Sequence, residues 1–418
     1  MTTRNFIDDF AMQRINENST KATESSWEVT VAKSIDAVEG IRPIWEKMHS
    51  GESYPIINSD IDRYLSVIEA CGNNVRPYVM LLKENDQPVA MLIGRLEQNQ
   101  IKSRLGYKTL LTPKLRCLTV VYGGIIGQPR PDAYVLLVYE LMKILSRRES
   151  DVVYFNHLRT DSVVYQLARE MPGFWCRSRF PKIEPHWKMS VPDNIDLFYV
   201  RCSKSHRKHL RRYQRRLQND YEDRVKISTY SQMNEIERVI EDASEISRKT
   251  YQYALGYGFA KDGKRQVQLQ TAARNGWLRA HILYVANEPI AYRIVLKYGR
   301  TCFLSGTGYD PKWRKYNPGT ILFLNVLEKL CADHAVESID FGFGDAEFKR
   351  SYGDHHWQEA SIYIFAPRLY PIVVNVLRTS IVAVNSALKH IFRKAGFAAI
   401  IKRKWRNALQ AGNKHRRE

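Results

Sequence analysis

The chain has 418 residues, of which 44% are hydrophobic, 11% aromatic and 26% charged. This composition is ordinary for a folded protein and excludes disordered, collagen-like and disulfide-scaffold chains. At about 100–200 residues per domain, the length predicts two or three domains. The six cysteines form no C-x-x-C or Cys/His pattern, so we expect no metal site, no disulfide framework and a reducing cytoplasm.

The net charge of +20 is concentrated in two segments. Residues 201–217 hold eight Lys/Arg and no acid, and residues 361–418 hold twelve Lys/Arg and one acid. The rest of the chain is close to neutral. Each basic segment is therefore expected to attract phosphate, anionic lipid or nucleic acid.

Neither a signal peptide nor a spanning helix is expected. Residues 1–26 are polar, mixed in charge and predicted to be flexible, without the apolar core of a signal peptide. No window reaches the roughly 18 uninterrupted apolar residues of a transmembrane helix. We therefore expect a cytoplasmic protein, either soluble or peripheral on the inner membrane face.

A pattern of apolar strand, polar turn and second apolar strand occurs twice, at residues 76–94 and 278–296. In both, the second strand opens with Pro-(Val/Ile)-Ala, which is typical of a β-hairpin. A helical pattern and another strand follow each hairpin. This repetition predicts two copies of one α/β unit, at 27–195 and 196–366, followed by a basic tail at 367–418. The alternative is that such hairpins recur by chance in unrelated α/β proteins.

The second copy contains a candidate phosphate-binding turn. Asn317 occupies an N-cap position and Pro318 the first position of a helix, which then repeats apolar residues at helical spacing. The helix start has no acid, a glycine at Gly319, and the flanking cations Lys312, Arg314 and Lys315. Free N–H groups and the helix dipole would suit a pyrophosphate there. The alternative is a capped surface helix beside a solvated basic loop.

An acidic turn follows the next strand. The strand that begins at Ser338 contains Asp340 and ends in two glycines, with Asp345 and Lys349 just beyond. A carboxylate at a strand end could accept a proton from an attacking amine or hydroxyl. The alternatives are that Asp345 caps a helix or turn and that Lys349 forms a salt bridge. The equivalent part of the first copy, residues 123–131, has two prolines and a lone Arg130. We expect the first copy to be non-catalytic, to pack against the second and to help wall the acceptor cleft.

Three stretches together resemble the CelD/BcsL-type, BioF-associated branch of the GNAT acetyltransferases, which is related to the FemAB aminoacyl transferases. They are the basic run from Ser203 to Leu217, the Tyr309-x-Pro311 and Tyr316-Asn317-Pro318-Gly319 pair, and Asp340-Phe341-Gly342-x-Gly344-Asp345-x-x-Phe348-Lys349. Two departures stand out. Phe348-Lys349 and Tyr352 replace the family's Tyr-Lys and Trp, and the usual R/Q-x-x-G-x-G/A phosphate loop is missing.

The resemblance implies tandem GNAT-like units, each a mixed, mostly antiparallel sheet flanked by helices. It implies acyl transfer from acetyl-CoA or another acyl-CoA to an amine or hydroxyl, without a metal, in polysaccharide (including cellulose) or cell-envelope biosynthesis. The N–H groups of Gly319 and Thr320, with Arg314, Lys315 and Asn317, would hold the CoA pyrophosphate, and strands splaying beside residues 303–306 would admit the pantetheine.

Direct attack in a ternary complex needs no enzyme nucleophile. Asp345, or alternatively Asp340, would accept the proton. Lys349 would orient that carboxylate or neutralise its charge. Contacts with the acceptor substrate are assigned to Arg207, Arg211, Tyr309 and Tyr352.

The basic run is expected to form a helix from Ser203 with a narrow apolar line and closely spaced cations. Like charges at i,i+4 destabilise a helix, so an anionic partner is expected. It could be nearby acids or CoA phosphates, an anionic glycan or lipid head group, or tRNA. Aromatic interleaving is limited to Tyr213, which favours an acidic acceptor or membrane over nucleic acid. The alternative is a solvated charged face.

The tail has apolar residues at helical spacing from Leu369 to Phe392, and Trp405 among cations, which is typical of an interfacial helix pair on an anionic membrane. The alternative is that these apolar residues of the tail pack against the protein core. Two other functions remain open at this stage. One is FemAB-like transfer from aminoacyl-tRNA gripped by the basic helix, and the other is a catalytically silent scaffold tethered to the membrane.

Overall fold

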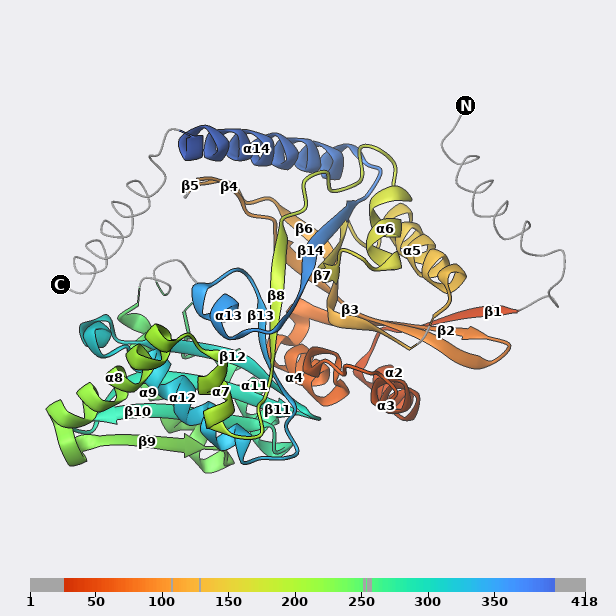
Figure 1. The fold of residues 1–418 in the computed structure, drawn as a ribbon. Coiled ribbons are helices and arrows are strands. Elements are labelled where there is room, and N and C mark those ends of the chain that lie inside the picture. The colour runs from red at the N-terminus through yellow and green to blue at the C-terminus, as the bar shows by residue number, and fades with distance from the viewer. Residues whose placement is uncertain (1–25, 107, 128, 251–252, 254–257, 395–418) are drawn as a thin grey trace. The chain divides into compact units, whose positions relative to one another are not determined.

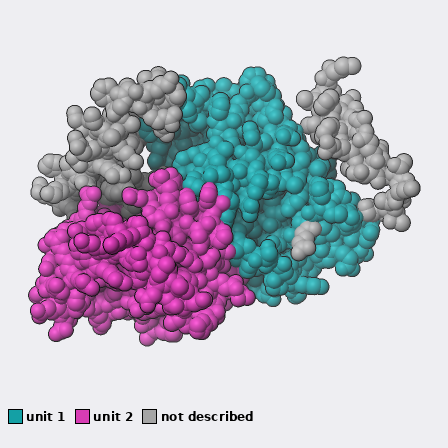
Figure 2. All heavy atoms as spheres, viewed as in Figure 1, with its two compact units in different colours: residues 1–185, 357–395 teal, residues 186–356, 396–418 magenta. Residues whose placement is uncertain are grey.

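The computed structural model describes residues 26–394, except 107, 128, 251–252 and 254–257. The chain divides into two compact units (Figure 2). Unit 1 contains residues 1–185 and 357–395, and unit 2 contains residues 186–356 and 396–418. Each unit is a mixed sheet covered by helices (Figure 1).

Unit 1 is built on a sheet of order β1-β2-β3-β6-β7-β14. All neighbours are antiparallel except β6 and β7, which are parallel. The strands are β1 Trp27–Ala32, β2 Val75–Glu84, β3 Gln87–Gln100, β6 Lys114–Gly127, β7 Val152–Arg159 and β14 His355–Phe365. A separate small hairpin is formed by β4 Ser103–Leu105 and β5 Lys108–Leu111.

Helices cover both faces of the unit 1 sheet. Met80 and Leu82 on one face pack with α5 Pro131–Ser146 and α6 Val163–Glu170. Alternate residues such as Val79 and Leu81 pack on the other face with α2 Ile35–Gly40, α3 Arg42–Ser50 and α4 Ile61–Cys71. Burial on both faces explains why β2 reads as a continuous apolar run rather than an alternating one.

Unit 2 has a sheet of order β8-β13-β12-β11-β10-β9, in which only β12 and β13 are parallel. The strands are β8 Ile183–Ser190, β9 Val225–Tyr230, β10 Leu278–Val285, β11 Glu288–Tyr298, β12 Thr301–Tyr309 and β13 Ser338–Phe343. The helices are α7 Ile195–Arg201, α8 Lys204–Tyr221, α9 Ile236–Arg248, α11 Gly263–Arg274, α12 Pro318–Cys331 and α13 Glu347–Tyr352, with the 3-10 helix η5 at Pro311–Tyr316.

Two adjacent residues of β11 show which helices cover each face of this sheet. The Tyr292 ring packs against Phe259, beyond the end of α9, whereas Arg293 points to Gly319 and Phe323 of α12. Because successive strand residues point to opposite faces, α9 and α12 cover opposite sides. Helices α7 and α8 contribute to the same core as α12.

The two units repeat one topology, which confirms the tandem α/β architecture expected from the sequence. The β2–β3 turn places Asn85 and Asp86 at positive φ, and the β10–β11 turn does the same with Ala286 and Asn287. Both are two-residue turns of the kind that joins twisted antiparallel strands. Register shifts occur at corresponding places, after Leu82 in β2 and after Leu283 in β10.

The sheet of unit 1 is completed by a strand that follows unit 2 in the chain, and the sheet of unit 2 by the strand that joins the two units. In unit 1, β14 pairs antiparallel with β7 from Phe365↔Val152 to Glu359↔Arg159. In unit 2, β8 pairs antiparallel with β13. This division differs from the expected boundaries at 195/196 and 366/367, because the sequence gives the order of the strands but not their pairing partners.

The expected helical tail is present as α14, Leu369–Lys394. It belongs to unit 1. Trp405, the second helix expected around it, and nearly all of the flexible segment 1–26 lie outside the described residues.

Strand β12 contains a glycine where a side chain would collide. A Cβ built on Gly308 lies 2.6 Å from a Tyr292 ring carbon, whereas one on Gly306 meets nothing closer than 3.7 Å. We expect Gly308→Ala to cost about 1–3 kcal/mol, because the Tyr292 ring is held by Phe259. Gly306→Ala, in the same strand, is the control and should cost less. Urea unfolding measures both, and equal effects would contradict this explanation.

Candidate active site

The site is organised by the separation of β12 and β13 in unit 2. These parallel strands pair only from Thr301↔Ser338 to Phe303↔Asp340. Beyond Phe303, β12 continues to Tyr309 and β13 to Phe343 without pairing to each other. The structure therefore places the expected divergence of strands beside residues 303–306.

Helix α12 begins next to this divergence, with one amide available. The Asn317 carbonyl accepts hydrogen bonds from the N–H of Thr320 (3.0 Å) and Ile321 (3.3 Å). The Asn317 side chain makes no capping bond, contrary to expectation, because its backbone is left-handed rather than extended (φ 51°, ψ 54°). The Gly319 N–H is given no acceptor by the described residues, and no acid occupies the first turn. The free donor expected at Gly319 is thus present, whereas that of Thr320 is used within the chain.

The cations before α12 lie on η5 and are exposed. Lys315 lies 4.6 Å from the centre of the Tyr316 ring, and the Tyr316 hydroxyl donates to Asp220 (2.6 Å). Lys312 has only a distant ion pair with Glu288 (3.9 Å). Within the described part of the chain, Arg314 forms no ion pair. Most of the positive charge at this helix start therefore has no close ion pair among the described residues.

A buried arginine, which the sequence analysis missed, lies under the start of α12. Arg293 is 5% exposed, and its Nη2 donates to the Gly319 carbonyl (3.3 Å). Its Nε and Nη1 are buried without a hydrogen-bond partner, and its guanidinium lies 5.1 Å from the centre of the Phe323 ring. Burial lowers the pKa of Arg293 to about 10, so it stays charged at neutral pH. In the sequence, the one sign of this site residue is a cation inside the apolar run that forms β11.

Two tyrosines that were expected to contact substrate flank this helix start. The Tyr309 ring lies 3.7 Å from where a Cβ on Gly319 would be. The Tyr352 ring stacks on Phe323 at 4.9 Å. Burial raises the pKa of Tyr352 to about 12, against smaller opposing effects from Arg293 and from the Thr320 side chain facing its hydroxyl. Tyr352 is therefore a neutral hydroxyl at neutral pH.

A histidine beside Tyr352 was also missed. The His206 ring lies 5.8 Å from that of Tyr352, and its Nε2 is buried without a hydrogen-bond partner. His206 is in the first turn of α8, where its N–H donates to the Ser203 hydroxyl oxygen (3.2 Å). Arg293 and His206 thus add buried polar atoms without a hydrogen-bond partner to the region around the α12 start.

The three residues expected to catalyse differ in their surroundings. Asp340 is 2% exposed, lies 2.7 Å from His186 Nε2, and accepts the Gly342 N–H (2.5 Å). Lys349 Nζ donates to the carbonyls of Gly342 (3.0 Å) and Phe343 (2.8 Å), which holds the turn. Asp345 is half exposed and pairs with Arg350 Nε (3.0 Å). Of the three, Asp345 is the one that presents its charge to solvent.

The basic run forms α8, which packs against α12 and η5 through Leu210 and Leu217. Arg211 lies 5.4 Å from the centre of the Tyr199 ring, and Arg207 is half buried. No cation of α8 forms an ion pair with any carboxylate that the structure describes. The described acids of this unit therefore form no ion pair with these cations, and an external anion and a solvated charged face stay the two alternatives.

In unit 1, carboxylates of the protein itself occupy the corresponding helix start, that of α5. Asp132 lies in the first turn of α5 and accepts the Ala133 N–H (3.0 Å). The Gly127 N–H donates to Glu52 (2.7 Å), and Ile56 lies 2.8 Å from where a Cβ on Gly123 would be. Carboxylates at this helix start disfavour an anion.

Comparisons with known proteins agree with this geometry. Residues 204–350 match the family described as an acetyltransferase (GNAT) domain. No curated protein that was compared matches the chain. Among solved structures, FemX is similar with a TM-score of 0.53 at 8% identity, covering 80% of this chain and 98% of FemX. A tandem GNAT protein from the clavulanic acid biosynthesis pathway has a TM-score of 0.50 at 11% identity, covering 82% and 100%.

The fold and the family match define the class of protein. Residues 204–350 of unit 2 match a GNAT acetyltransferase domain, and the chain has the fold of a tandem GNAT protein. The expected resemblance to GNAT proteins is confirmed, and FemX shares the fold.

Proposed function

We propose that unit 2 transfers an acyl group from acyl-CoA, in the simplest case acetyl-CoA, to an amine or hydroxyl acceptor. The observation that carries this proposal is the start of α12. There, the unbonded Gly319 N–H, the exposed Arg314 and Lys315, and the buried charge of Arg293 converge without a carboxylate in the first turn. This arrangement suits a diphosphate.

In this proposal the CoA pyrophosphate is held by the Gly319 N–H, Arg314 and Lys315. Asn317 shapes the turn through its left-handed backbone, and Thr320 contributes its hydroxyl because its N–H is used by the Asn317 carbonyl. The pantetheine arm would run along β12 beyond Phe303, where β13 no longer pairs with it.

The reaction would be a direct attack of the acceptor nitrogen or oxygen on the thioester carbonyl. The new C–N or C–O bond forms as the C–S bond breaks, and the acceptor's proton passes to Asp345. Tyr352, protonated because of its raised pKa, would donate a hydrogen bond to the departing sulfur. Asp340 and Lys349 hold the turn that carries Asp345, and Tyr309, Arg207 and Arg211 would contact the acceptor.

Replacing Asp345 with asparagine tests the assignment of the base. We expect kcat to fall by about 100-fold while affinity for the donor stays within about twofold, because the amide cannot accept the proton. Steady-state kinetics and calorimetry measure the two quantities. Glu347→Gln, which removes a carboxylate from the same turn, is the control. Full turnover in Asp345→Asn would remove Asp345 from the mechanism.

A second candidate function is transfer from aminoacyl-tRNA. It is favoured by the cations of α8, which no described carboxylate answers, and fits the fold shared with FemX. Calorimetry with acetyl-CoA and, separately, with charged tRNA distinguishes the two. Binding of acetyl-CoA that weakens at least tenfold in Lys315→Ala supports the first. Binding of tRNA alone supports the second, and binding of neither favours a silent scaffold. In the acyl-CoA proposal, the acceptor is a saccharide of polysaccharide or cell-envelope assembly.

A further inference from the structure

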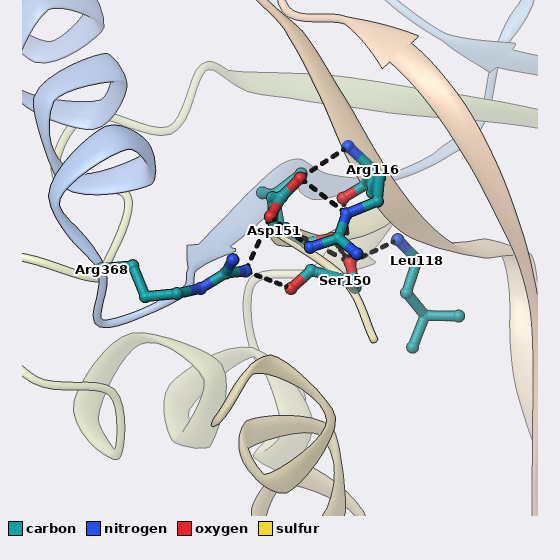
Figure 3. A network of polar contacts seen from close by, with 6 residues as sticks. Arg116, Leu118, Ser150, Asp151 and Arg368 are labelled. Atoms are coloured by element: carbon teal, nitrogen blue, oxygen red, sulfur yellow. Dashed lines mark hydrogen bonds and ion pairs between the residues drawn. The ribbon is translucent and has the colours of Figure 1, made fainter. Parts of the chain in front are cut away.

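Helix α14 of unit 1 is fixed to the unit along one side. At its start, Arg368 Nη2 donates to Asp151 (2.7 Å) and to the Ser150 carbonyl (2.8 Å), within a network that includes Arg116 (Figure 3). Burial would raise the pKa of Asp151, but hydrogen bonds from the two arginines outweigh it and leave the pKa below its usual value. This carboxylate is therefore charged and anchors the helix.

Two polar residues further along α14 continue this docked side. Asn375 Nδ2 donates to the backbone carbonyls of Trp175 (2.9 Å) and Arg177 (3.1 Å). The Arg378 guanidinium lies 4.5 Å from the centre of the Tyr363 ring and donates to the Ser178 hydroxyl oxygen (3.3 Å). The helix thus holds the segment around residues 175–178 against itself.

The opposite side of α14 is apolar and exposed. Leu369 is 81% exposed, and further apolar side chains recur along the same helix at helical spacing. They are Tyr370, Val373, Val376, Leu377, Val384 and Leu388. The whole helix contains no acidic residue. By length and composition alone, Leu369–Leu388 would be long and apolar enough to cross a membrane.

The segment joined to α14 is also apolar and basic. Trp175 is 57% exposed, and Phe174, Phe180 and Ile183 are more than half exposed. Arg179 lies 3.5 Å from the centre of the Phe174 ring. Asn375 ties this segment to α14, and the exposed apolar residues of the two are together called here the apolar face of unit 1. Exposed apolar patches of this kind on a soluble protein mark interaction sites.

We propose that the apolar face of unit 1 docks on an anionic lipid bilayer, with α14 lying in the interface. Exposed aromatic and aliphatic side chains among arginines, without acids, are the composition of an interfacial surface. The alternative of a second copy is disfavoured, since residues 174–183 and 369–388 carry Arg177, Arg179, Lys182 and Arg378 and no acid, so that two such surfaces repel. A spanning helix is disfavoured because Asn375 and Arg378 are engaged by the unit itself.

Co-sedimentation of the full chain with lipid vesicles tests this proposal without any donor or acceptor, so its outcome is separate from that of the proposed function. We expect binding to phosphatidylcholine vesicles that contain phosphatidylglycerol and at least tenfold weaker binding to phosphatidylcholine alone. The double variant Val373→Glu/Leu377→Glu should bind the anionic vesicles at least tenfold more weakly. So should Trp175→Ala/Phe180→Ala, which leaves α14 unchanged.

Ile35→Glu and Met233→Glu, which place the same charge on exposed apolar positions elsewhere, are the matched controls. Circular dichroism verifies that each variant is folded. Unchanged binding in both double variants would overturn the proposal, as would equal binding to the neutral vesicles. Sedimentation that shows a dimer broken by these variants, without lipid binding, would assign the face to a second copy and also overturn it.

Discussion

Arg293→Met is expected to make the protein more stable and its donor binding weaker. Arg293 is buried with two unpartnered N–H-bearing nitrogens and no carboxylate beside it, which costs free energy in the folded state. An unbranched apolar side chain of similar length should remove that cost and raise the free energy of unfolding by about 1–3 kcal/mol. If the charge serves the donor's phosphates, affinity for acetyl-CoA should fall at least tenfold.

Urea unfolding and calorimetry on the same preparation measure these two changes. Arg279→Met is the control, since Arg279, at the start of β10, donates to the carbonyls of Gly276 and Leu278. It should leave donor affinity unchanged. A loss of both stability and affinity in Arg293→Met would instead show that the arginine mainly supports the fold. A gain in stability with full affinity would show that the donor does not use this charge.

Asp340→Ala is expected to be among the most destabilising single substitutions in unit 2. The change leaves His186 and the Gly342 N–H buried without their acceptor, which should cost about 3 kcal/mol. Asp345→Ala, five residues later, removes an exposed carboxylate and should change stability by less than about 0.5 kcal/mol. Urea unfolding at neutral pH measures both.

A double-mutant cycle tests whether the loss of stability comes from the His186–Asp340 contact or from a general loss of packing. His186→Ala and Asp340→Ala together should cost much less than the sum of the single changes, because each single variant already removes the shared contact. Additive effects, or equal effects of Asp340→Ala and Asp345→Ala, would contradict the assignment. Activity of the folded variants then reports whether the turn after β13 also matters for catalysis.

Elements that depend on local pattern were predictable from the sequence. The two hairpins followed from apolar runs interrupted by polar turns, and the start of α12 followed from Asn317 and Pro318. The charged turn at Asp345 was located by its two glycines. In each case the evidence lies within about ten neighbouring residues, which is the range over which strand and helix periodicity acts.

Features that depend on long-range pairing were not predictable. His186 and Asp340 meet although they are 154 residues apart. Arg293 reads as one cation in an apolar strand, and only the fold shows that no carboxylate among the described residues pairs with it. The tail illustrates the same limit, because the sequence left docking and membrane attachment as alternatives. In the structure α14 has one side docked on unit 1 and an exposed apolar side, so docking is observed and membrane attachment stays a proposal.

The placement of β14 makes the N-terminal half of the chain dependent on a strand that follows the residues of unit 2. A fragment ending at residue 185 would lack the strand that completes its sheet, and the remaining fragment would carry that strand with its hydrogen-bonding edge unsatisfied. Separately expressed halves should therefore aggregate, yet reconstitute when co-expressed.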